Sequence, residues 1–472
     1  MEERAVGKAD SGCKFKYILL FYPDMSQWRF FHKNLDRELF SLAWPVILSN
    51  LLQTVTMFVD LVMVGQLGHE ALAAVGLGGQ VLFFVWAIIM GLSTGTIAIV
   101  ARRSGEGKMK TADNVLKQSL VLGIILSIPA AVIGSVFGAQ MLSVFGAEDQ
   151  VVSLGYEYIS TVFLASPAIF VFIIASSALR GVGDTRTPLY VSVILNLINF
   201  TLNYCLIFGN FGFPQLGVRG AAVGTSIAFI ASLLIYVFIL SRPRSKIHLR
   251  RKGPTLTIKT IRSILRIGTP SALEQALIQF GFVIFIVYIV SFGTEALAAH
   301  NIGGRIQSLA FMPGFGFAVA TTTMVGQSLG TKNPAKAERS GWEGTKLSLI
   351  TMSSIGFLMI FMANPISRLF ASESVVVSLS IDWIMLLALA MPAIGIHFTM
   401  TGALQGAGDT KWPLYVSFIG LYLLRLPLAY VLGFMTPLGV NGVWISMVLE
   451  YYVRAIIITS RFKKGKWKRI SV

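Results

Sequence analysis

The sequence predicts an all-α polytopic membrane protein, and three observations lead to that prediction. Hydrophobic residues make up 54% of the 472 residues and charged residues only 13%, which is about half the charged share typical of soluble domains. The apolar residues lie in long runs, which is typical of spanning helices and not of the alternating strands of a membrane barrel. The chain also contains an internal repeat, which predicts two similar halves.

A helix needs about 20 mostly apolar residues to cross the hydrocarbon core of a bilayer. Twelve such runs follow one another along the chain, and each predicts one transmembrane helix. They are centred near residues 52, 89, 127, 168, 198, 229, 280, 314, 355, 391, 423 and 450.

The repeat has a constant offset of 225 residues. Glu70–Ala74 recurs as Glu295–Ala299, and Pro188–Ser192 recurs as Pro413–Ser417. Each copy holds six runs, so both copies enter the membrane from the same side and are related by a pseudo-twofold axis along its normal. The predicted divisions are a cytoplasmic extension (1–37), an N-lobe with helices 1–6 (38–241), a basic cytoplasmic linker (242–266), a C-lobe with helices 7–12 (267–460) and a basic cytoplasmic tail (461–472).

The basic residues predict the orientation. Most of the 39 Lys and Arg residues fall in the segments that are cytoplasmic if the N-terminus is inside, which is the pattern of the positive-inside rule. Both termini are therefore expected in the cytoplasm, on a multi-pass protein of the cell membrane. The net charge of +17 is then explained by topology and by anionic lipid, and nucleic acid is excluded as a partner.

The first half carries one clear ionisable residue inside a predicted span, Asp60 in helix 1. Such a residue costs about 2.5–3.5 kcal/mol on insertion, and it is usually functional. The second copy has Phe285 at the matching position, so the carboxylate is not part of the shared scaffold. The alternative is a neutral carboxyl group that only bonds a neighbouring helix. The candidate substrate-binding residues are Gln53, Thr56, Asp60 and Asn196.

Helix 5 adds two amides on one side, Asn199 and Asn203, which lie four residues apart. Thr225 in helix 6 is expected to close a polar pocket that these amides share with Asp60. Such oxygen ligands suit either a proton carrier or a small hard cation such as Na⁺ bound at Asp60, Asn199 and Asn203. The alternative is that the two amides only bond neighbouring helices. The second copy has leucines at the matching positions, Leu424 and Leu428.

The second half carries weaker candidates. A position at the membrane interface is the alternative for Glu274, an internal ion pair is the alternative for Arg425 with Glu450, and a core position is the alternative for His397. The chain contains no phosphate-binding loop and no cluster of metal ligands, so neither an enzyme nor a cofactor is expected. The secondary candidates are Glu274 with Gln275 and Gln279 alongside, and four residues expected as buried charges, Arg305, His397, Arg425 and Glu450.

Two motifs resemble a known family. They are Phe58–Gly65, followed by Leu67–Ala74, and the string Ala178–Pro188 with its echo Ala403–Pro413. Over about residues 36–460 the chain is similar to the MATE (multidrug and toxic compound extrusion) transporters of prokaryotic type.

The resemblance implies alternating access and secondary active efflux of small organic compounds, often cations, driven by H⁺ or Na⁺. It places the coupling carboxylate at Asp60 and the polar pair of helix 5 at Asn199 and Asn203. Another branch of the family uses acids in helices 7 and 10, for which Glu274 and Asp382 are the candidates. A monomer is expected to be functional. A flippase of lipids or lipid-linked oligosaccharides, from the same superfamily, is the alternative.

Overall fold

The computed structural model describes residues 33–144, 146–249 and 257–470. Most of the predicted N-terminal extension (1–37) and part of the predicted linker (242–266) lie outside these residues. Residues 33–37 do not form a separate segment, because the first described helix already begins at Lys33.

The first half of the chain forms seven α-helices within the described residues. The predicted fourth span is broken, because two helices meet at Ala165 with an angle of 54° between them. Pro167 occupies the first turn after the break, where its missing N–H costs nothing. The helices are α2 (Lys33–Gly65), α3 (His69–Gly105), α4 (Met109–Ser143), α5 (Asp149–Leu164), α6 (Ser166–Gly181), α7 (Arg186–Phe208) and α8 (Gly217–Ser241).

The second half also forms six spans, but its break falls at Phe311 in the second span and not in the fourth, and a π-helical stretch interrupts its fifth span. Its elements are α9 (Ile258–Val290), α10 (Thr294–Ala310), α11 (Met312–Gly330), α12 (Pro334–Phe370), α13 (Ser374–Gly406), α14 (Lys411–Phe418), the π-helical η3 (Ile419–Arg425), α15 (Leu426–Phe434) and α16 (Gly439–Lys463). Among the described residues 11 helices are long and apolar enough to span a membrane, or 12 if the bent pair counts as one. The predicted all-helical polytopic architecture is therefore confirmed.

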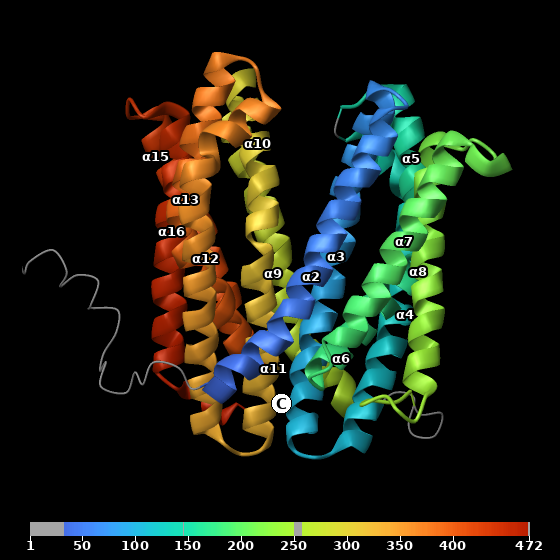
Figure 1. The fold of residues 1–472 in the computed structure, drawn as a ribbon, viewed down its shortest axis with the longest axis vertical. Coiled ribbons are helices and arrows are strands. Elements are labelled where there is room, and N and C mark those ends of the chain that lie inside the picture. The colour runs from blue at the N-terminus through green and yellow to red at the C-terminus, as the bar shows by residue number, and fades with distance from the viewer. Residues whose placement is uncertain (1–32, 145, 250–256, 471–472) are drawn as a thin grey trace, which may run out of the picture.

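The helices form two groups, α2–α8 and α9–α16 (Figure 1). The groups meet at the end of the molecule where the C-terminus lies, and they separate towards the opposite end. We call the first the basic end, because the turns around Arg102–Lys110 and Lys332–Lys336 and the tail Arg461–Arg469 lie there. The exact boundaries of the two lobes remain a prediction.

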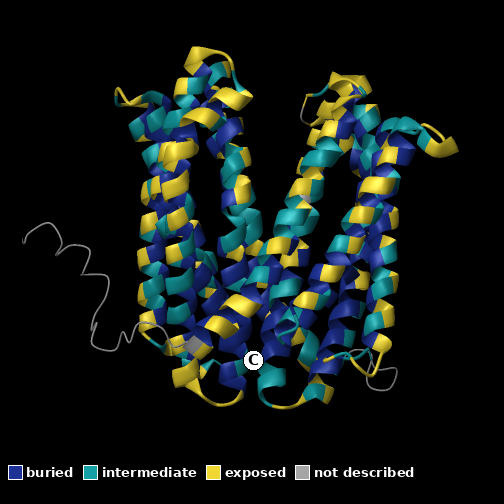
Figure 2. Cartoon of the chain, viewed as in Figure 1, coloured by how far each residue is buried: buried dark blue, intermediate teal, exposed yellow. Residues whose placement is uncertain are grey.

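Small residues let the two groups approach closely at the basic end. A Cβ atom on Gly91 of α3 would lie 2.6 Å from the carbonyl oxygen of Gly268 on α9, so the two backbones are nearly in contact. Side chains add hydrogen bonds across the same boundary: Thr323 Oγ1 donates to Arg180 O over 3.0 Å and Gln327 Nε2 donates to Gly181 O over 2.9 Å. Buried residues accordingly concentrate in this half of the molecule (Figure 2).

The π-helical stretch absorbs one inserted residue. The fifth span of the first copy, α7, has 23 residues, whereas the matching span Lys411–Phe434 has 24. A π-bulge is the usual way for a helix to accept one extra residue. Beyond η3 the offset becomes 226, so Tyr204 matches Tyr430.

The insertion changes which residues are equivalent. Asn199 matches Arg425, and Asn203 matches Ala429. The prediction that Leu424 and Leu428 occupy these positions is therefore wrong, because a constant offset cannot register an insertion inside the repeat.

Candidate functional site

Asp60 lies on α2, five residues before the helix ends, and faces α7. Its Oδ1 accepts a hydrogen bond of 2.8 Å from Nδ2 of Asn203. The two residues are 143 positions apart in the chain, and the packing of α2 against α7 joins them. The amide group thus binds the carboxylate from the side of the lobe interior.

The polar chain continues into α8. Asn203 Nδ2 lies 3.4 Å from Asn199 Oδ1, and Asn199 Nδ2 donates to Thr225 Oγ1 over 3.0 Å. Asn199 is 2% exposed and Asn203 is fully buried. The structure thus joins the four residues that the sequence proposed for cation coupling into one hydrogen-bonded chain across α2, α7 and α8.

Within this set of four hydrogen-bonded side chains, one amide oxygen has no partner among the described residues. It is Oδ1 of Asn203, a buried atom. It faces Gly224 of α8 so closely that a Cβ atom there would contact it. Sequence reasoning missed Gly224, because nothing local distinguishes it from the other glycines of α8.

The atoms gathered here are carboxylate, amide and hydroxyl oxygens. A hard cation such as Na⁺ prefers oxygen ligands of this kind, and a carboxylate can alternatively take up a proton. No group of three or more His, Cys, Asp or Glu residues suited to a transition metal occurs in the described parts of the chain. The residues present therefore fit a proton or a small monovalent cation.

Of the predicted substrate-binding residues, Asp60 belongs to this hydrogen-bonded chain and the other three do not. Gln53 is exposed on α2. Thr56 donates to the carbonyl oxygen of Leu52 in its own helix over 2.9 Å. Asn196 lies on α7 two turns from Asn203, and its Nδ2 is buried without a partner among the described residues.

The second half contains a different polar network between the equivalent helices. Glu450 on α16 accepts from Arg425 over 2.6 Å and from Arg454 over 3.0 Å. Arg454 also donates to Ser417 Oγ over 2.6 Å, and Ser417 donates to Glu274 Oε1 over 2.8 Å. The ion pair expected between Arg425 and Glu450 is present, and Glu274 is joined to it.

This network balances its charges, because two carboxylates and two guanidinium groups face one another. Glu274, Arg425, Glu450 and Arg454 are each at most 4% exposed. Buried charges require such partners, since an uncompensated charge in the interior costs several kcal/mol. The sequence did not show that Ser417 and Arg454 would connect Glu274 to Glu450.

The other secondary candidates do not share one site. His397 is buried, and its Nδ1 has no partner within the described part of the chain. Gln279 Nε2 donates to Gln80 Oε1 across the two groups of helices over 3.3 Å. Gln275 is half-buried on α9. Arg305 is exposed on α10, so its prediction as a buried charge is wrong.

Two parallel six-span halves, with a polar site inside one of them, define a class of membrane transporter. The MatE family model matches residues 45–205 and again 270–431. Together these matches cover more than half of the chain, and their starting points are 225 residues apart, the offset of the repeat. The chain belongs to the MATE family of transporters.

Relatives agree over nearly the whole length. The chain is 31% identical over 437 residues to the probable multidrug resistance protein NorM of Thermotoga maritima, covering 92% of this chain and 94% of the relative. It is 26% identical over 437 residues to the probable multidrug resistance protein YoeA of Bacillus subtilis, covering 90% of this chain and 92% of that protein.

Solved structures show the same fold. A multidrug resistance MATE family transporter of the MOP superfamily, in an outward-facing conformation, superposes with a TM-score of 0.86 at 24% identity and covers 92% of this chain and 97% of its own. A MOP superfamily transporter from Pyrococcus furiosus superposes with a TM-score of 0.86 at 24% identity. The match covers 96% of this chain and 99% of that transporter. Family and fold confirm the predicted resemblance, and membership of a transporter family confirms that the chain is not an enzyme.

Proposed function

We propose that this chain is a secondary active multidrug exporter that exchanges H⁺ or Na⁺ for small organic, cationic compounds. The observation that carries the proposal is the Asp60 carboxylate, which accepts a hydrogen bond from Asn203 within the spanning helix α2. The relatives named for multidrug resistance support the class of substrate. Thr225 and Asn199 complete the set of oxygen atoms around the coupling ion.

The proposed coupling rests on the charge of Asp60. A bare carboxylate inside a membrane protein is costly, and a proton or Na⁺ would neutralise it. An organic cation near Asp60 would be stabilised by the same charge. The ion and the substrate would therefore exclude each other, which links uptake of one to release of the other.

The charge balance of the C-lobe network supports the assignment of coupling to the N-lobe. Glu274 lies beside Ser417, which also accepts from Arg454. Neutralising Glu274 would leave two guanidinium groups facing only the Glu450 carboxylate. Asp60 has no basic group within ion-pair distance among the described residues, so its neutralisation leaves no unbalanced charge.

The positive-inside pattern supports an orientation with the basic end in the cytoplasm and both termini there. The two groups of helices meet at this end (Figure 1), which corresponds to an outward-facing state of an alternating-access cycle in the cell membrane. Both polar networks lie inside single lobes, which favours a functional monomer.

The test is efflux of a fluorescent organic cation from cells that make the wild type, Asp60→Asn or Glu157→Gln, with Na⁺ and pH varied separately. Glu157 is an exposed acid of the same lobe and serves as the matched control. Loss of efflux only in Asp60→Asn supports the proposal, and the ion dependence identifies the driving ion. Equal efflux in all three would move coupling to Glu274. No efflux from well-expressed wild type would favour a flippase, which a lipid-translocation assay would then test.

A further inference from the structure

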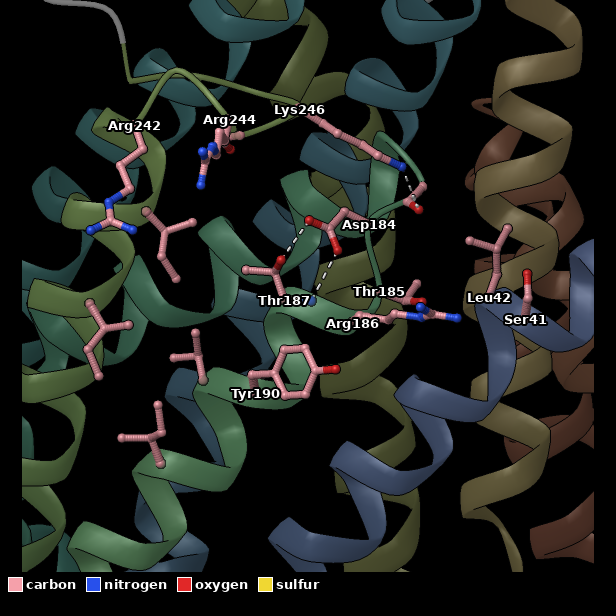
Figure 3. Close-up of a pocket in the computed structure, with 16 residues that line it drawn as sticks. Ser41, Leu42, Asp184, Thr185, Arg186, Thr187, Tyr190, Arg242, Arg244 and Lys246 are labelled. Atoms are coloured by element: carbon pink, nitrogen blue, oxygen red, sulfur yellow. Dashed lines mark hydrogen bonds between the residues drawn. The ribbon is translucent and has the colours of Figure 1, made fainter.

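A cavity of about 640 Å³ lies at the basic end of the first half of the molecule. It is formed by the first turns of α7, the last turns of α8, the segment that follows α8, and Ser41 and Leu42 of α2 (Figure 3). None of the predicted cation-binding or substrate-binding residues lines it. The cavity is therefore separate from the Asp60 site.

Four basic side chains surround the cavity, and all four are exposed: Arg186, Arg242, Arg244 and Lys246. No carboxylate of the described residues lies within 4.0 Å of any of them. Arg242 stacks on the ring of Phe238 at 3.9 Å, and Lys246 Nζ lies 3.5 Å from the carbonyl oxygen of Gly183. The positive charge of the cavity is thus not neutralised by the described part of the chain.

The single acid in the wall of the cavity, Asp184, is already hydrogen-bonded to Thr187. Its carboxylate accepts from the backbone N–H of Thr187 over 3.0 Å and from Thr187 Oγ1 over 2.7 Å (Figure 3). These bonds satisfy the first turn of α7, where a negative charge is favourable. Four cations and one engaged carboxylate leave a site that favours an anion.

An apolar surface adjoins the basic side chains of the cavity. Tyr190 and Ile194 lie one turn apart on α7 and are 62% and 40% exposed. Ile235 and Ile239 lie one turn apart on α8 and line the same cavity. A soluble anion would not contact such an apolar surface. An anionic lipid requires both a basic site for its head group and an adjacent apolar groove for its acyl chains.

The second half of the chain has different side chains and contacts at the equivalent position. Asp409, which matches Asp184 in the repeat, accepts from Arg461 at 2.8 and 2.9 Å. Trp412 stands where the first copy has Thr187, and the Arg461 guanidinium lies 4.8 Å above its ring. The side chains at this position therefore differ between the two copies, and the repeated scaffold alone does not account for the basic lining of the cavity.

We propose that this cavity binds the head group of an anionic phospholipid. Its phosphate would lie among Arg186, Arg244 and Lys246, because guanidinium and ammonium groups bind phosphate strongly. Its acyl chains would follow the apolar faces of α7 and α8 into the bilayer. On the orientation proposed above, this lipid comes from the cytoplasmic leaflet. The site does not depend on the transport function.

The test uses the full-length protein, purified in detergent, stripped of lipid and titrated with phosphatidylglycerol or phosphatidylcholine. Native mass spectrometry counts the bound lipid. The site variant is Arg186→Gln with Arg244→Gln. The matched control is Lys463→Gln with Lys464→Gln, which removes two exposed charges at the same end of the molecule. A third variant, Thr187→Trp, places the tryptophan of the second copy in the wall of the cavity and keeps the basic residues of the cavity.

We expect wild type and control to retain one phosphatidylglycerol in preference to phosphatidylcholine. The site variant should bind it about 25-fold more weakly, since each basic residue near an anionic lipid contributes about fivefold. Thr187→Trp should also lose it. Binding that falls equally in the control would show general surface attraction and overturn the proposal. Displacement of the lipid by millimolar inorganic phosphate would show a simple anion site and overturn it as well.

Discussion

Gly105 and Gly330 hold equivalent positions in the two copies and make equivalent contacts with the opposite half. A Cβ atom on Gly105 would contact the backbone of Gln327, and one on Gly330 would contact the backbone of Arg102. Arg102 and Gln327 are themselves 225 residues apart, so the two contacts are related by the pseudo-twofold axis. They close the two halves at the basic end, and alternating access requires this closure to open.

Gly105→Leu should force the two halves apart at the basic end. Overpacking of this kind costs about 1–3 kcal/mol, which is enough to shift a conformational equilibrium by about 5- to 150-fold. Electron–electron distance measurements between spin labels at positions 110 and 335 would report a larger separation. Gly76→Leu, on the same helix but facing open space, should leave the distance unchanged. An unaltered distance in Gly105→Leu would show that the contact does not determine closure.

Asn203→Ala should weaken binding of the coupling cation about tenfold or more. A hydrogen bond to a charged group contributes about 1.5–3 kcal/mol, and this substitution removes the one that Asp60 accepts from Nδ2. The half-saturating cation concentration of transport measures the effect. Asn196→Ala removes an amide from the same helix that does not bond Asp60, and it should change this concentration little. Equal effects of the two substitutions would contradict a role for the Asp60 contact.

Glu450→Gln should destabilise the second half more strongly than Glu274→Gln, because Glu450 pairs directly with both arginines and Glu274 is joined to them through Ser417. Removal of one charge from a buried ion pair costs about 3–5 kcal/mol, and Glu450 is the partner of two arginines. A glutamine at position 274 can still accept the hydrogen bond from Ser417. Thermal unfolding in detergent should therefore give a much lower Tm for Glu450→Gln. The reverse order of Tm values would show that Glu274 carries the network.

Glu106, in the turn after α3, should make stability depend on pH. Burial raises the pKa of this carboxyl, but Lys108 and Arg103 outweigh burial and hold the pKa below its ordinary value. A lowered pKa in the folded state stabilises the protein above the ordinary value, near 4.3, and this contribution is lost as the pH falls through the lowered pKa. Glu106→Gln should thus cost about 0.5–1 kcal/mol at pH 7.

The comparison is the Tm of wild type and Glu106→Gln between pH 3 and pH 8. The difference between the two proteins should shrink as the pH falls below about 4. Glu157→Gln, at an exposed site of α5, provides the control. A difference that stays constant down to pH 3 would show that the ion pairs of Glu106 do not contribute.

The sequence alone determined the number of spans, the repeat and the presence of an unusual ionisable residue, Asp60, inside a span. Each of these features can be read from the composition and order of the residues. Long apolar runs have no soluble alternative, and a charge within such a run is costly wherever its neighbours lie. The positions of Asn199 and Asn203 on one side of a helix also follow from helical periodicity alone. For these reasons the members of the N-lobe polar chain could be named before their contacts were known.

Only the tertiary structure decided which side chains meet. Asn203 bonds Asp60, whereas Thr56, a predicted substrate-binding residue, bonds the backbone of its own helix. Because of a single inserted residue in η3, the residue of the second copy that is equivalent to Asn199 is Arg425 and not a leucine. Contacts of this kind depend on the rotation and register of packed helices, which the whole core determines together and no single segment encodes. The cavity beside Arg186 has the same origin, because residues of α2, α7 and α8 that are far apart in the sequence form its walls together.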